Sequence, residues 1–424
     1  MITFPRHLAR VTAALAFTAI GLPAAKSALG ATLITSVPGV AELQAIGTSS
    51  PNYATVVVQG YYDGSTVGGG QFIWVPGNCT PDGGTIFSAS GVPTSGTGAG
   101  CWYRQFDGNL YMASWFGAKP SNATGDATIN TNALQAGLNA AQAVSKGFML
   151  DQCERYYINN GLSLPLSTTL YQGYPLRILG CGAASPFAGN AITGDPNQAH
   201  GSILSMVGDH VLLAYHDWGT HDGSGEVEVS NIRFEGTTSS ELVYFQVFTG
   251  HSSFHHNQLA QYGTGSGIVC DTCITSSIEW NTILGASWNN SSGSRTGTGI
   301  TVRTAVNGGL IKIANNTSRG FQYAFYIGGG AGQLLKPLFD HNEASDCTYG
   351  WYLVASGSSS QTQGAVFTSN YAEGISGAVF TDNGQYTRIE GSWAFSGYTS
   401  FIVIGSGITG NIYAFNMPAT QDNH

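Results

Sequence analysis

The sequence predicts an all-β protein, built as a right-handed, single-stranded parallel β-helix with a capping helix and a small β subdomain at its N-terminal side. The first observation is a repeat between residues 254 and 416, in which an apolar residue is followed three positions later by Asn. The repeated positions are Asn257, Asn281, Asn316, Asn342, Asn370, the degenerate Ser392 and Asn416. Units of 24, 35, 26, 28, 22 and 24 residues must stack on their neighbours to bury an apolar face.

The second observation is a short apolar run that begins nine residues after the Asn or Ser in most copies. Each repeat therefore holds at least two strands with turns between them, which is too little chain for a helical repeat. Parallel strands joined in this way cross over in the right-handed sense. We expect the Asn positions to adopt the left-handed backbone that Asn tolerates, and their side chains to bond from coil to coil.

The composition is that of a globular protein with a large core. The chain has 424 residues, of which 42% are hydrophobic, 11% aromatic and 9% charged, and this apolar content excludes general disorder despite 59 Gly. The repeat favours one long solenoid over two or three separate domains. The net charge of −9 disfavours nucleic acid as a partner, because neutralising phosphates requires Lys and Arg.

Residues 1–31 are typical of a secretory signal peptide. A basic start with Arg6, His7 and Arg10 is followed by an apolar core over residues 11–22 and a small-residue cleavage zone. The apolar core is too short to span a bilayer stably, and an uncleaved anchor is the alternative. The sequence therefore predicts a secreted protein, extracellular or periplasmic.

Export makes the seven cysteines potential disulfide partners. The expected pairs are Cys79 with Cys101, which bracket a Gly/Ser/Thr-rich loop, and Cys153 with Cys181, which lie about one coil apart. Cys270 and Cys273 form a CxxC motif without a second ligand pair at zinc spacing, so a local disulfide and two packed thiols both stay open. Cys347 is left over, and we expect it to be buried.

The remaining elements follow in chain order. Residues 32–112 are strand-like and turn-rich and predict the small β subdomain, and residues 113–424 the β-helix. The one convincing helix lies near 131–145, where Thr131 or Asn132 can cap it. Its apolar face is lined by Leu134, Leu138, Ala141 and Val144. A helix placed here covers the open end of the solenoid.

Several motifs stand in an informative order: Gly-Gly-Gly-Gln-Phe-Ile-Trp at 68–74, Trp-Tyr-Arg at 102–104, Trp-Phe-Gly-Ala at 115–118, Ala-Leu-Gln at 133–135 and a strand at 176–180. In this order the sequence resembles the pectate-lyase-like (pectin-lyase-like) β-helix superfamily, in particular phage tailspikes, capsular depolymerases and secreted bacterial relatives. The resemblance covers about residues 40–185 by motif and the rest by repeat period. It implies cleavage of a polysaccharide, by hydrolysis or β-elimination, in a superfamily whose members often form homotrimers. Two departures are the runs at 125–130 and 150–156, where the superfamily usually has Asp-Gly-x-x-Asp-Asp-Thr and Leu-Pro-x-Gly-x-Tyr.

Equivalent residues of stacked parallel strands lie roughly 4.8 Å apart, so columns of residues build a site. The position two residues before each Asn or Ser is expected to point outward, and its column reads His255, Glu279, Ala314, Asp340, Thr368 and Glu390. Glu279 and Asp340 would be about 9.6 Å apart, near the upper limit for the carboxylates of an inverting glycosidase. His255 would lie one coil from Glu279 and tune its protonation. The alternative is that these polar residues are simply solvated.

A second column places Asp271 beside Arg303. The pair could hold an anionic sugar, or it could be an exposed ion pair that contributes little. Asp217 and Asp222, in a His- and Asp-rich segment one or two coils earlier, could bind Ca²⁺, as in many polysaccharide lyases, or act as general acid and base. An ordinary polar turn is the alternative for these two residues. The sequence itself requires no cofactor.

The 35-residue step contains extra chain at residues 286–295, and insertions in a solenoid frequently lie over the binding face. Trp288 in this insertion could stack on a sugar ring. The same coil carries four of the fifteen Lys and Arg residues, namely Arg295, Arg303, Lys312 and Arg319. This enrichment favours an anionic substrate group such as a uronic acid. The alternative is that Trp288 covers core and that the cations balance nearby acids.

The sequence therefore predicts a secreted enzyme that cleaves an extracellular, uronate-containing or other polysaccharide, with hydrolysis and β-elimination both open. Glu279 and Asp271 are the candidate acid and base, with Asp217 or Asp222 as partner and His255 as proton relay. The candidate substrate-binding residues are Trp288, Arg295, Arg303, Lys312 and Asp340. The alternative is a non-catalytic, adhesin-like β-helix that binds polysaccharide at the cell surface.

Overall fold

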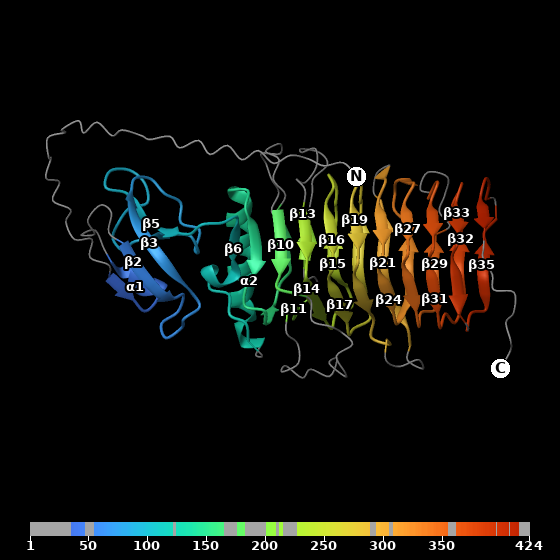
Figure 1. The fold of residues 1–424 in the computed structure, drawn as a ribbon, viewed down its shortest axis with the longest axis horizontal. Helices are drawn as coiled ribbons and strands as arrows, with labels where there is room; N and C mark the ends of the chain where they lie inside the picture. Colours follow the sequence, from blue (N-terminus) through green and yellow to red (C-terminus); the bar gives the residue numbers. More distant parts are fainter. Residues whose placement is uncertain are drawn as a thin grey trace, which may run out of the picture.

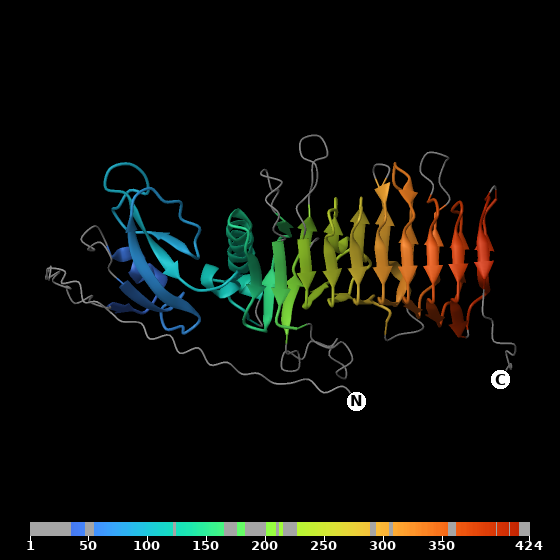
Figure 2. The same cartoon turned by 45° about the horizontal axis from the view of Figure 1, so that its top comes forward.

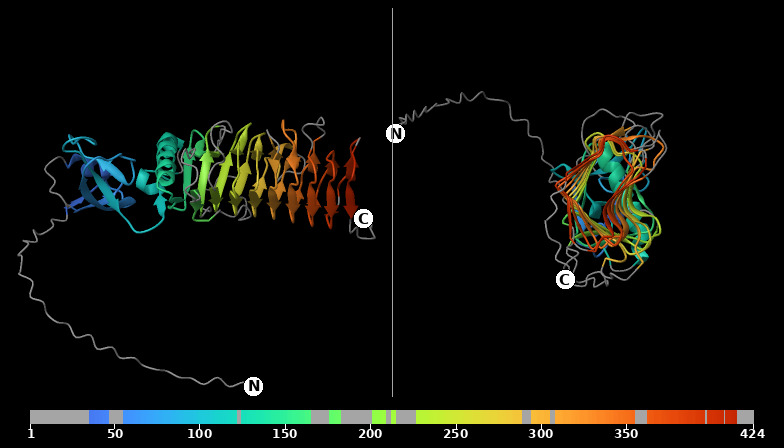
Figure 3. Two further views of the ribbon diagram at one scale, coloured as in Figure 1. Left: turned by 90° about the horizontal axis from the view of Figure 1, so that it is seen from above. Right: turned by 90° about the vertical axis from the view of Figure 1, so that its right-hand side faces the viewer.

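The computed structural model describes residues 35–46, 55–121, 124–164, 176–182, 201–208, 212–214, 227–288, 294–304, 308–354, 362–395, 397–406 and 408–414. Three long parallel sheets run side by side along one axis (Figures 1 and 2). The chain passes from sheet to sheet and returns one strand further along. The architecture is thus the right-handed parallel β-helix that the sequence predicts. Seen end-on, successive coils superimpose (Figure 3).

Each complete coil contributes one strand to each of the three sheets, which is one strand more than the minimum of two that the repeat predicts. Sheet 1 contains β6 (Leu110–Met112), β7 (Gly147–Leu150), β10 (Leu176–Gly180), β13 (Val227–Ser230), β16 (Ser253–His255), β19 (Ser277–Glu279), β23 (Lys312–Ala314), β27 (Leu338–Asp340), β30 (Val366–Thr368), β33 (Arg388–Glu390) and β36 (Ile412–Ala414). Sheet 2 contains β8 (Arg155–Ile158), β11 (Ser202–Met206), β14 (Ile232–Gly236), β17 (Gln258–Gln261), β20 (Thr282–Leu284), β24 (Thr317–Arg319), β28 (Glu343–Ser345), β31 (Tyr371–Glu373) and β34 (Trp393–Phe395). Sheet 3 contains β9 (Leu162–Leu164), β12 (Leu212–Ala214), β15 (Glu241–Phe245), β18 (Ser266–Asp271), β21 (Thr296–Arg303), β25 (Phe321–Ile327), β29 (Tyr349–Leu353), β32 (Ala378–Asp382) and β35 (Ser400–Ile404). Two short strands, β22 (Gly308–Gly309) and β26 (Leu334–Leu335), pair outside these sheets.

A smaller five-stranded sheet precedes the solenoid, with strand order β1-β2-β3-β5-β4. Its elements are β1 (Thr35–Val37), α1 (Val40–Ala45), β2 (Thr55–Gly60), β3 (Gly68–Pro76), β4 (Ile86–Ser88) and β5 (Gly100–Gln105). β1 pairs with β2 in parallel, and the other pairs are antiparallel. β6, which the sequence assigns to this subdomain, pairs with β7 and begins sheet 1.

Arg104 ties the small sheet to the start of the solenoid. Its side chain is buried, and its guanidinium donates to the carbonyl oxygens of Gly84 (3.0 Å) and Gly68 (2.9 Å). The same group lies over the rings of Phe72 and Trp115, 4.6 and 4.8 Å from their centroids. Burial lowers the pKa of Arg104 to about 10. Trp115 belongs to the 3-10 helix η1 (Ala113–Phe116), so this one cation connects both parts of the chain.

The predicted capping helix is present as α2 (Ala127–Ala143), across the N-terminal end of the solenoid (Figure 1). It begins four residues before the predicted start, after the 3-10 helix η2 (Thr124–Asp126), and its N-cap is Asp126 instead of Thr131 or Asn132. The Thr131 hydroxyl donates to the carbonyl of Ala127 within the helix. Of the predicted apolar face, Leu134, Leu138 and Ala141 are buried, whereas Val144 follows the helix and is exposed.

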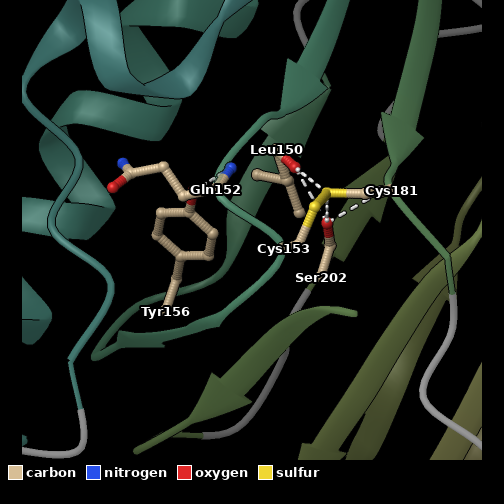
Figure 4. Close-up of a disulfide and its surroundings, with 6 residues drawn as sticks. All are labelled: Leu150, Gln152, Cys153, Tyr156, Cys181 and Ser202. Carbon is tan, nitrogen blue, oxygen red and sulfur yellow. Dashed lines mark hydrogen bonds between the residues drawn. A yellow bond between two sulfur atoms is a disulfide. The ribbon is translucent and has the colours of Figure 1, made fainter. Parts of the chain in front are cut away.

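Disulfides join both predicted pairs, Cys79 with Cys101 and Cys153 with Cys181. The second links the segments that follow β7 and β10, which are neighbouring strands of sheet 1 (Figure 4). Beside it, the Ser202 hydroxyl donates to the carbonyl of Leu150 at 2.8 Å, so the first coils are fastened by a covalent bond and a buried hydrogen bond. Cys270 and Cys273 are also joined, and Cys347 is buried as predicted.

The repeated Asn side chains form a buried ladder along the solenoid. The backbone N–H of each Asn donates to the side-chain oxygen of the next: from Asn257 to Asn281, to Asn316, to Asn342 and to Asn370, over 2.9 to 3.1 Å. Within the described residues, the last bond of the ladder runs from the backbone N–H of Asn370 to the Ser392 hydroxyl, over 3.3 Å. The repeat position Asn416 lies outside the described residues. Each Asn side-chain amide from position 257 to 370 also donates to a carbonyl of the preceding coil. The predicted coil-to-coil bonding is therefore observed.

The left-handed backbone, however, belongs to the residue before each ladder Asn. Residues with φ between 52° and 57° are His256, Trp280, Asn315, His341 and Ser369. The expectation that the ladder Asn itself is left-handed is wrong. The left-handed residue turns the chain outward at the corner between sheets 1 and 2, which leaves the following Asn side chain inside to bond along the axis.

Inside the solenoid, aromatic rings stack in the same direction as the Asn ladder. Phe325, Trp351 and Phe380 lie in register on β25, β29 and β32, with centroid separations of 5.3 and 4.8 Å. None of the described helices is long and apolar enough to cross a membrane. The predicted signal peptide at 1–31 lies outside the described residues.

Replacing a central member of the Asn ladder tests its contribution to stability. Asn316→Ala removes two hydrogen bonds that Asn281 donates and two that Asn316 donates, all buried. We expect the free energy of unfolding to fall by about 2–4 kcal/mol, because buried groups are left unsatisfied. Chemical denaturation followed by circular dichroism measures this loss. Asn315→Gly, at the adjacent left-handed position, should cost less than about 1 kcal/mol, and equal losses would contradict the ladder's role.

Candidate functional site

The outward column predicted on sheet 1 is present in the observed register. Successive strands align Ser230, His255, Glu279, Ala314, Asp340, Thr368 and Glu390. The inward neighbours in this sheet are core residues such as Phe254 and Ile278. Successive residues of a strand point alternately inward and outward, so the residues next to this buried column place their titratable side chains on one outer face of the solenoid.

Glu279 and Asp340 lie two coils apart, with the small Ala314 between them. The Lys312 ammonium is 2.6 Å from a carboxylate oxygen of Glu279. Asp340 accepts a hydrogen bond from the Thr368 hydroxyl at 2.6 Å and lies 2.7 Å from Nδ1 of His341. Each carboxylate is thus held by its own polar partner. Two steps of the ordinary strand spacing, about 9.6 Å, separate the strands that carry them.

His255 lies between two carboxylates. Its Nε2 is 3.5 Å from Glu228, and Glu279 is its neighbour on the next strand. Its Nδ1 is 2.9 Å from Nδ1 of His256. Burial lowers the pKa of His255, with His256 acting in the same direction, while Glu228 and Glu279 act against them. The imidazole is therefore neutral at pH 7 and able to accept a proton.

Glu228 and its partner Arg177 extend this face toward the N-terminus and were not among the predicted site residues. Arg177 Nε is 2.7 Å from Glu228 Oε2, and this hydrogen bond is the main reason why the pKa of Glu228 is lowered. The coil of β13 lacks the apolar-x-x-Asn pattern, so it fell outside the repeat. The alternation of Val227, Glu228 and Val229 is the signal that could have found it.

Trp280 is an exposed aromatic ring directly after Glu279. Its side chain is 56% exposed, its backbone is left-handed, and its ring stacks on that of His256 at 6.1 Å with an interplanar angle of 14°. Trp288, the predicted stacking residue, is only partly exposed, and the Arg319 guanidinium lies 6.0 Å from its ring centroid. On the described surface, the more accessible indole beside the carboxylates is that of Trp280.

The four cations of the long coil do not form one patch. Arg295 donates to the carbonyl of Cys347 at 2.6 Å and to the Ser376 hydroxyl at 3.1 Å. Lys312 lies on sheet 1 and Arg319 on sheet 2, where Arg319 pairs with Asp346. Because one coil crosses three sheets, residues close in sequence face in different directions. Balancing by nearby acids, the alternative considered for these cations, matches what is observed for Lys312 and Arg319.

Asp271 and Arg303 lie side by side on sheet 3, as their predicted alignment requires. Arg303 Nε is 3.2 Å from Asp271 Oδ1, and the Tyr244 hydroxyl is 3.1 Å from Asp271 Oδ2. Glu279 belongs to sheet 1, so the structure does not bring Asp271 and Glu279 onto one face.

Asp217 and Asp222 lie outside the described residues. Within the described ranges, no group of three or more His, Cys, Asp or Glu residues could hold a metal ion.

Comparisons with known proteins bear on the fold. Residues 36–107 match the phage tail protein small four-stranded beta-sheet domain, which corresponds to the small N-terminal sheet. No curated protein matches the sequence.

Among solved structures, the chain is similar to a glycan biofilm modifying enzyme of Pantoea stewartii with a bacteriophage tailspike-like parallel beta-helix fold (TM-score 0.56, 14% identity, 90% of this chain and 52% of that one). It is also similar to the tailspike proteins of the Acinetobacter phages vB_ApiP_P1 (0.52, 15%, 90% and 70%) and vb_AbaP_AS12 (0.53, 14%, 91% and 59%). The chain has a tailspike-like fold. It spans about half the length of the Pantoea enzyme.

The charge state of His255 can be tested by titration. NMR of its ring protons should give a midpoint below the ordinary value of 6.5, because burial disfavours the imidazolium. His256→Gln should raise the midpoint and Glu228→Gln should lower it further. Since the folded pKa is lowered, the contribution of His255 to folding stability falls as the pH drops below 6.5. A midpoint above 6.5, or no response to either variant, would contradict this electrostatic description.

Proposed function

We propose that this protein is a secreted enzyme that binds an extracellular polysaccharide along the outer face of sheet 1 and cleaves it there by hydrolysis. The observation that carries the proposal is the pair Glu279 and Asp340, two coils apart in one outward column with Ala314 between them. Inverting hydrolysis uses two carboxyl groups about 6.5–9.5 Å apart, which leaves room for the attacking water. The tailspike-like fold of the glycan-modifying relative supports the same substrate class.

In this proposal the two carboxyl groups take different roles. Glu279 acts as the base that activates water, and Asp340 donates the proton to the leaving glycosidic oxygen. His341, 2.7 Å from Asp340, returns a proton to it after each turnover. Lys312 holds the Glu279 carboxylate in place, and the neutral His255 accepts the proton that Glu279 removes from water.

Trp280 and His256, at the corner next to Glu279, orient the substrate. A pyranose ring stacked on Trp280 would lie beside the Glu279 carboxylate, because the two residues are consecutive in the chain. The Trp280 ring already stacks on that of His256, so less conformational freedom is left for binding to remove.

A second candidate reaction is β-elimination. It needs a base and a cation that stabilises the enolate of a uronate, and Glu279 with Lys312 at 2.6 Å supplies both. The appearance of unsaturated uronate products would favour this reaction over hydrolysis. Export stays a prediction from the sequence, and the homotrimer stays one from the resemblance. Ca²⁺ binding by Asp217 and Asp222 stays one of the alternatives for that segment.

Substitution of Glu279 tests the proposal directly. A panel of acidic and neutral bacterial polysaccharides would first identify a substrate by release of reducing ends. Glu279→Gln should then lower the rate by about 10²–10⁴-fold, because the base is lost while the shape is kept.

The matched control is Glu390→Gln, in the same outward column but paired with Arg388 on its own strand. It should retain activity within about twofold. Equal effects of the two variants would overturn the assignment of Glu279. Binding without cleavage of any polysaccharide in the panel would favour the adhesin-like alternative.

A further inference from the structure

Sheet 3 carries an aromatic surface patch that lies on a different face from Glu279 and Asp340. The patch consists of Tyr323 and Tyr326 on β25, and Tyr349 and Tyr352 on β29, all four partly exposed. The register aligns Tyr323 with Tyr349 and Tyr326 with Tyr352. The inward residues beside them, Phe325 and Trp351, are fully buried, so the tyrosines project from the outer surface of the solenoid.

The four rings hold one another in fixed positions. Tyr323 stacks on Tyr349 at 5.1 Å, and Tyr326 stacks on Tyr352 at 5.8 Å, with interplanar angles of 14° and 10°. Edge-to-face contacts connect the two columns, the shortest being 4.9 Å between Tyr323 and Tyr352. Such mutual packing presents a large aromatic area whose side-chain entropy is already reduced before any ligand arrives.

Short side chains flank the second column of the patch on the neighbouring strands. In the second column, Tyr326 and Tyr352 are flanked by Thr301 on one side and Thr381 on the other. Thr381 is partly exposed and much shorter than Tyr352, so it does not cover the side of the Tyr352 ring that faces it. Among the described residues, none accepts or donates a hydrogen bond with the hydroxyl groups of the four tyrosines.

The charges around the patch cancel. Arg303, on the strand next to Tyr326, is paired with Asp271 at 3.2 Å, and the Tyr244 hydroxyl completes this small polar network. Burial raises the pKa values of Tyr323 and Tyr326, so both phenols are protonated hydrogen-bond donors at neutral pH. An uncharged surface of this kind, in a chain of net charge −9, suits an uncharged ligand better than a polyanion.

We propose that the four tyrosines, with Asp271 and Arg303 at their edge, form a second, non-catalytic binding site for neutral pyranose units of an extended glycan. The apolar faces of sugar rings pack on the tyrosines, while the phenols and the Asp271–Arg303 pair bind sugar hydroxyl groups. Strands of sheet 3 are stacked roughly 4.8 Å apart, close to the length of one pyranose unit, so a chain lying along the axis meets a ring at each step. Asp271 is then a binding residue and not a member of a catalytic pair.

Binding of defined oligosaccharides to the full chain tests this site. The probes are cellohexaose, maltohexaose and hexagalacturonate, measured by isothermal titration calorimetry. Glu279→Gln serves as the parent so that no probe is cleaved, which also separates this test from the proposed reaction on sheet 1. At least one of the two neutral probes should bind, and hexagalacturonate should bind more weakly at this patch.

Variants of the patch localise the binding. Tyr326→Ala with Tyr352→Ala should weaken the neutral probe by about 5- to 150-fold, and the pair of Phe substitutions, which keeps the packing, by about 2- to 12-fold. Tyr371→Ala, an outward tyrosine on sheet 2, is the control and should change affinity less than twofold.

The site is refuted if neither neutral probe binds, or if affinity is the same in the folded Phe variants, the Ala variants and the parent. A change of oligomeric state in the Tyr variants, seen by light scattering, would also overturn it, because the patch would then be a contact between copies of the chain. Loss of cleavage in Glu279→Gln with unchanged probe binding leaves the site intact.

Discussion

The buried Asn ladder is the interaction on which the rest of the structure depends. Main-chain hydrogen bonds alone would hold parallel strands together but would tolerate a shift in register in turn-rich, Gly-rich coils. A side-chain amide that must meet the equivalent residue of the next coil fixes that register at one point in every coil, from Asn257 to Ser392. Because an unsatisfied buried amide is costly, a slipped coil is strongly disfavoured.

Because the register is fixed, residues that are far apart in the sequence lie next to each other on the outer face of a sheet. Glu279 follows His255 by 24 positions and Asp340 follows Glu279 by 61, yet the three residues occupy one outward column of sheet 1. The same rule separates residues that look close in sequence. Asp271 and Glu279 are eight positions apart, but the turn between β18 and β19 carries them to different sheets.

Much of the fold could be predicted because its determinants repeat. The Asn period gave the β-helix, the outward column on sheet 1 and the pairing of Asp271 with Arg303 without any knowledge of the third strand in each coil. The start of α2 was placed four residues late because Thr131 and Asn132 are residue types that commonly cap helices. Here the Thr131 hydroxyl instead donates to the carbonyl of Ala127 within the helix. The left-handed residue was placed one position late, since Asn is common in that conformation but here is needed inside.

The candidate site was harder to predict, because the exposure of a side chain near a turn depends on how the chain bends from one sheet to the next. Trp288 looked like the stacking residue because it lies in an insertion, whereas the exposed ring beside Glu279 is Trp280, at a corner that the repeat treated as a spacer. Likewise the tyrosine patch on sheet 3 is visible only once the register aligns β25 with β29. The sequence alone identified the columns of equivalent residues. It did not show which columns lie next to each other where the chain turns from one sheet to the next.

The stereochemistry of the cleaved bond tests the central claim most directly. Proton NMR recorded during the first minutes of cleavage reports the anomeric configuration of the new reducing end. The spacing of Glu279 and Asp340, two coils apart in one column, predicts inversion, because a water molecule fits between the substrate and the base. A retained anomer would require carboxyl groups only about 5–5.5 Å apart and would contradict this pair, as would an unsaturated product that forms without water.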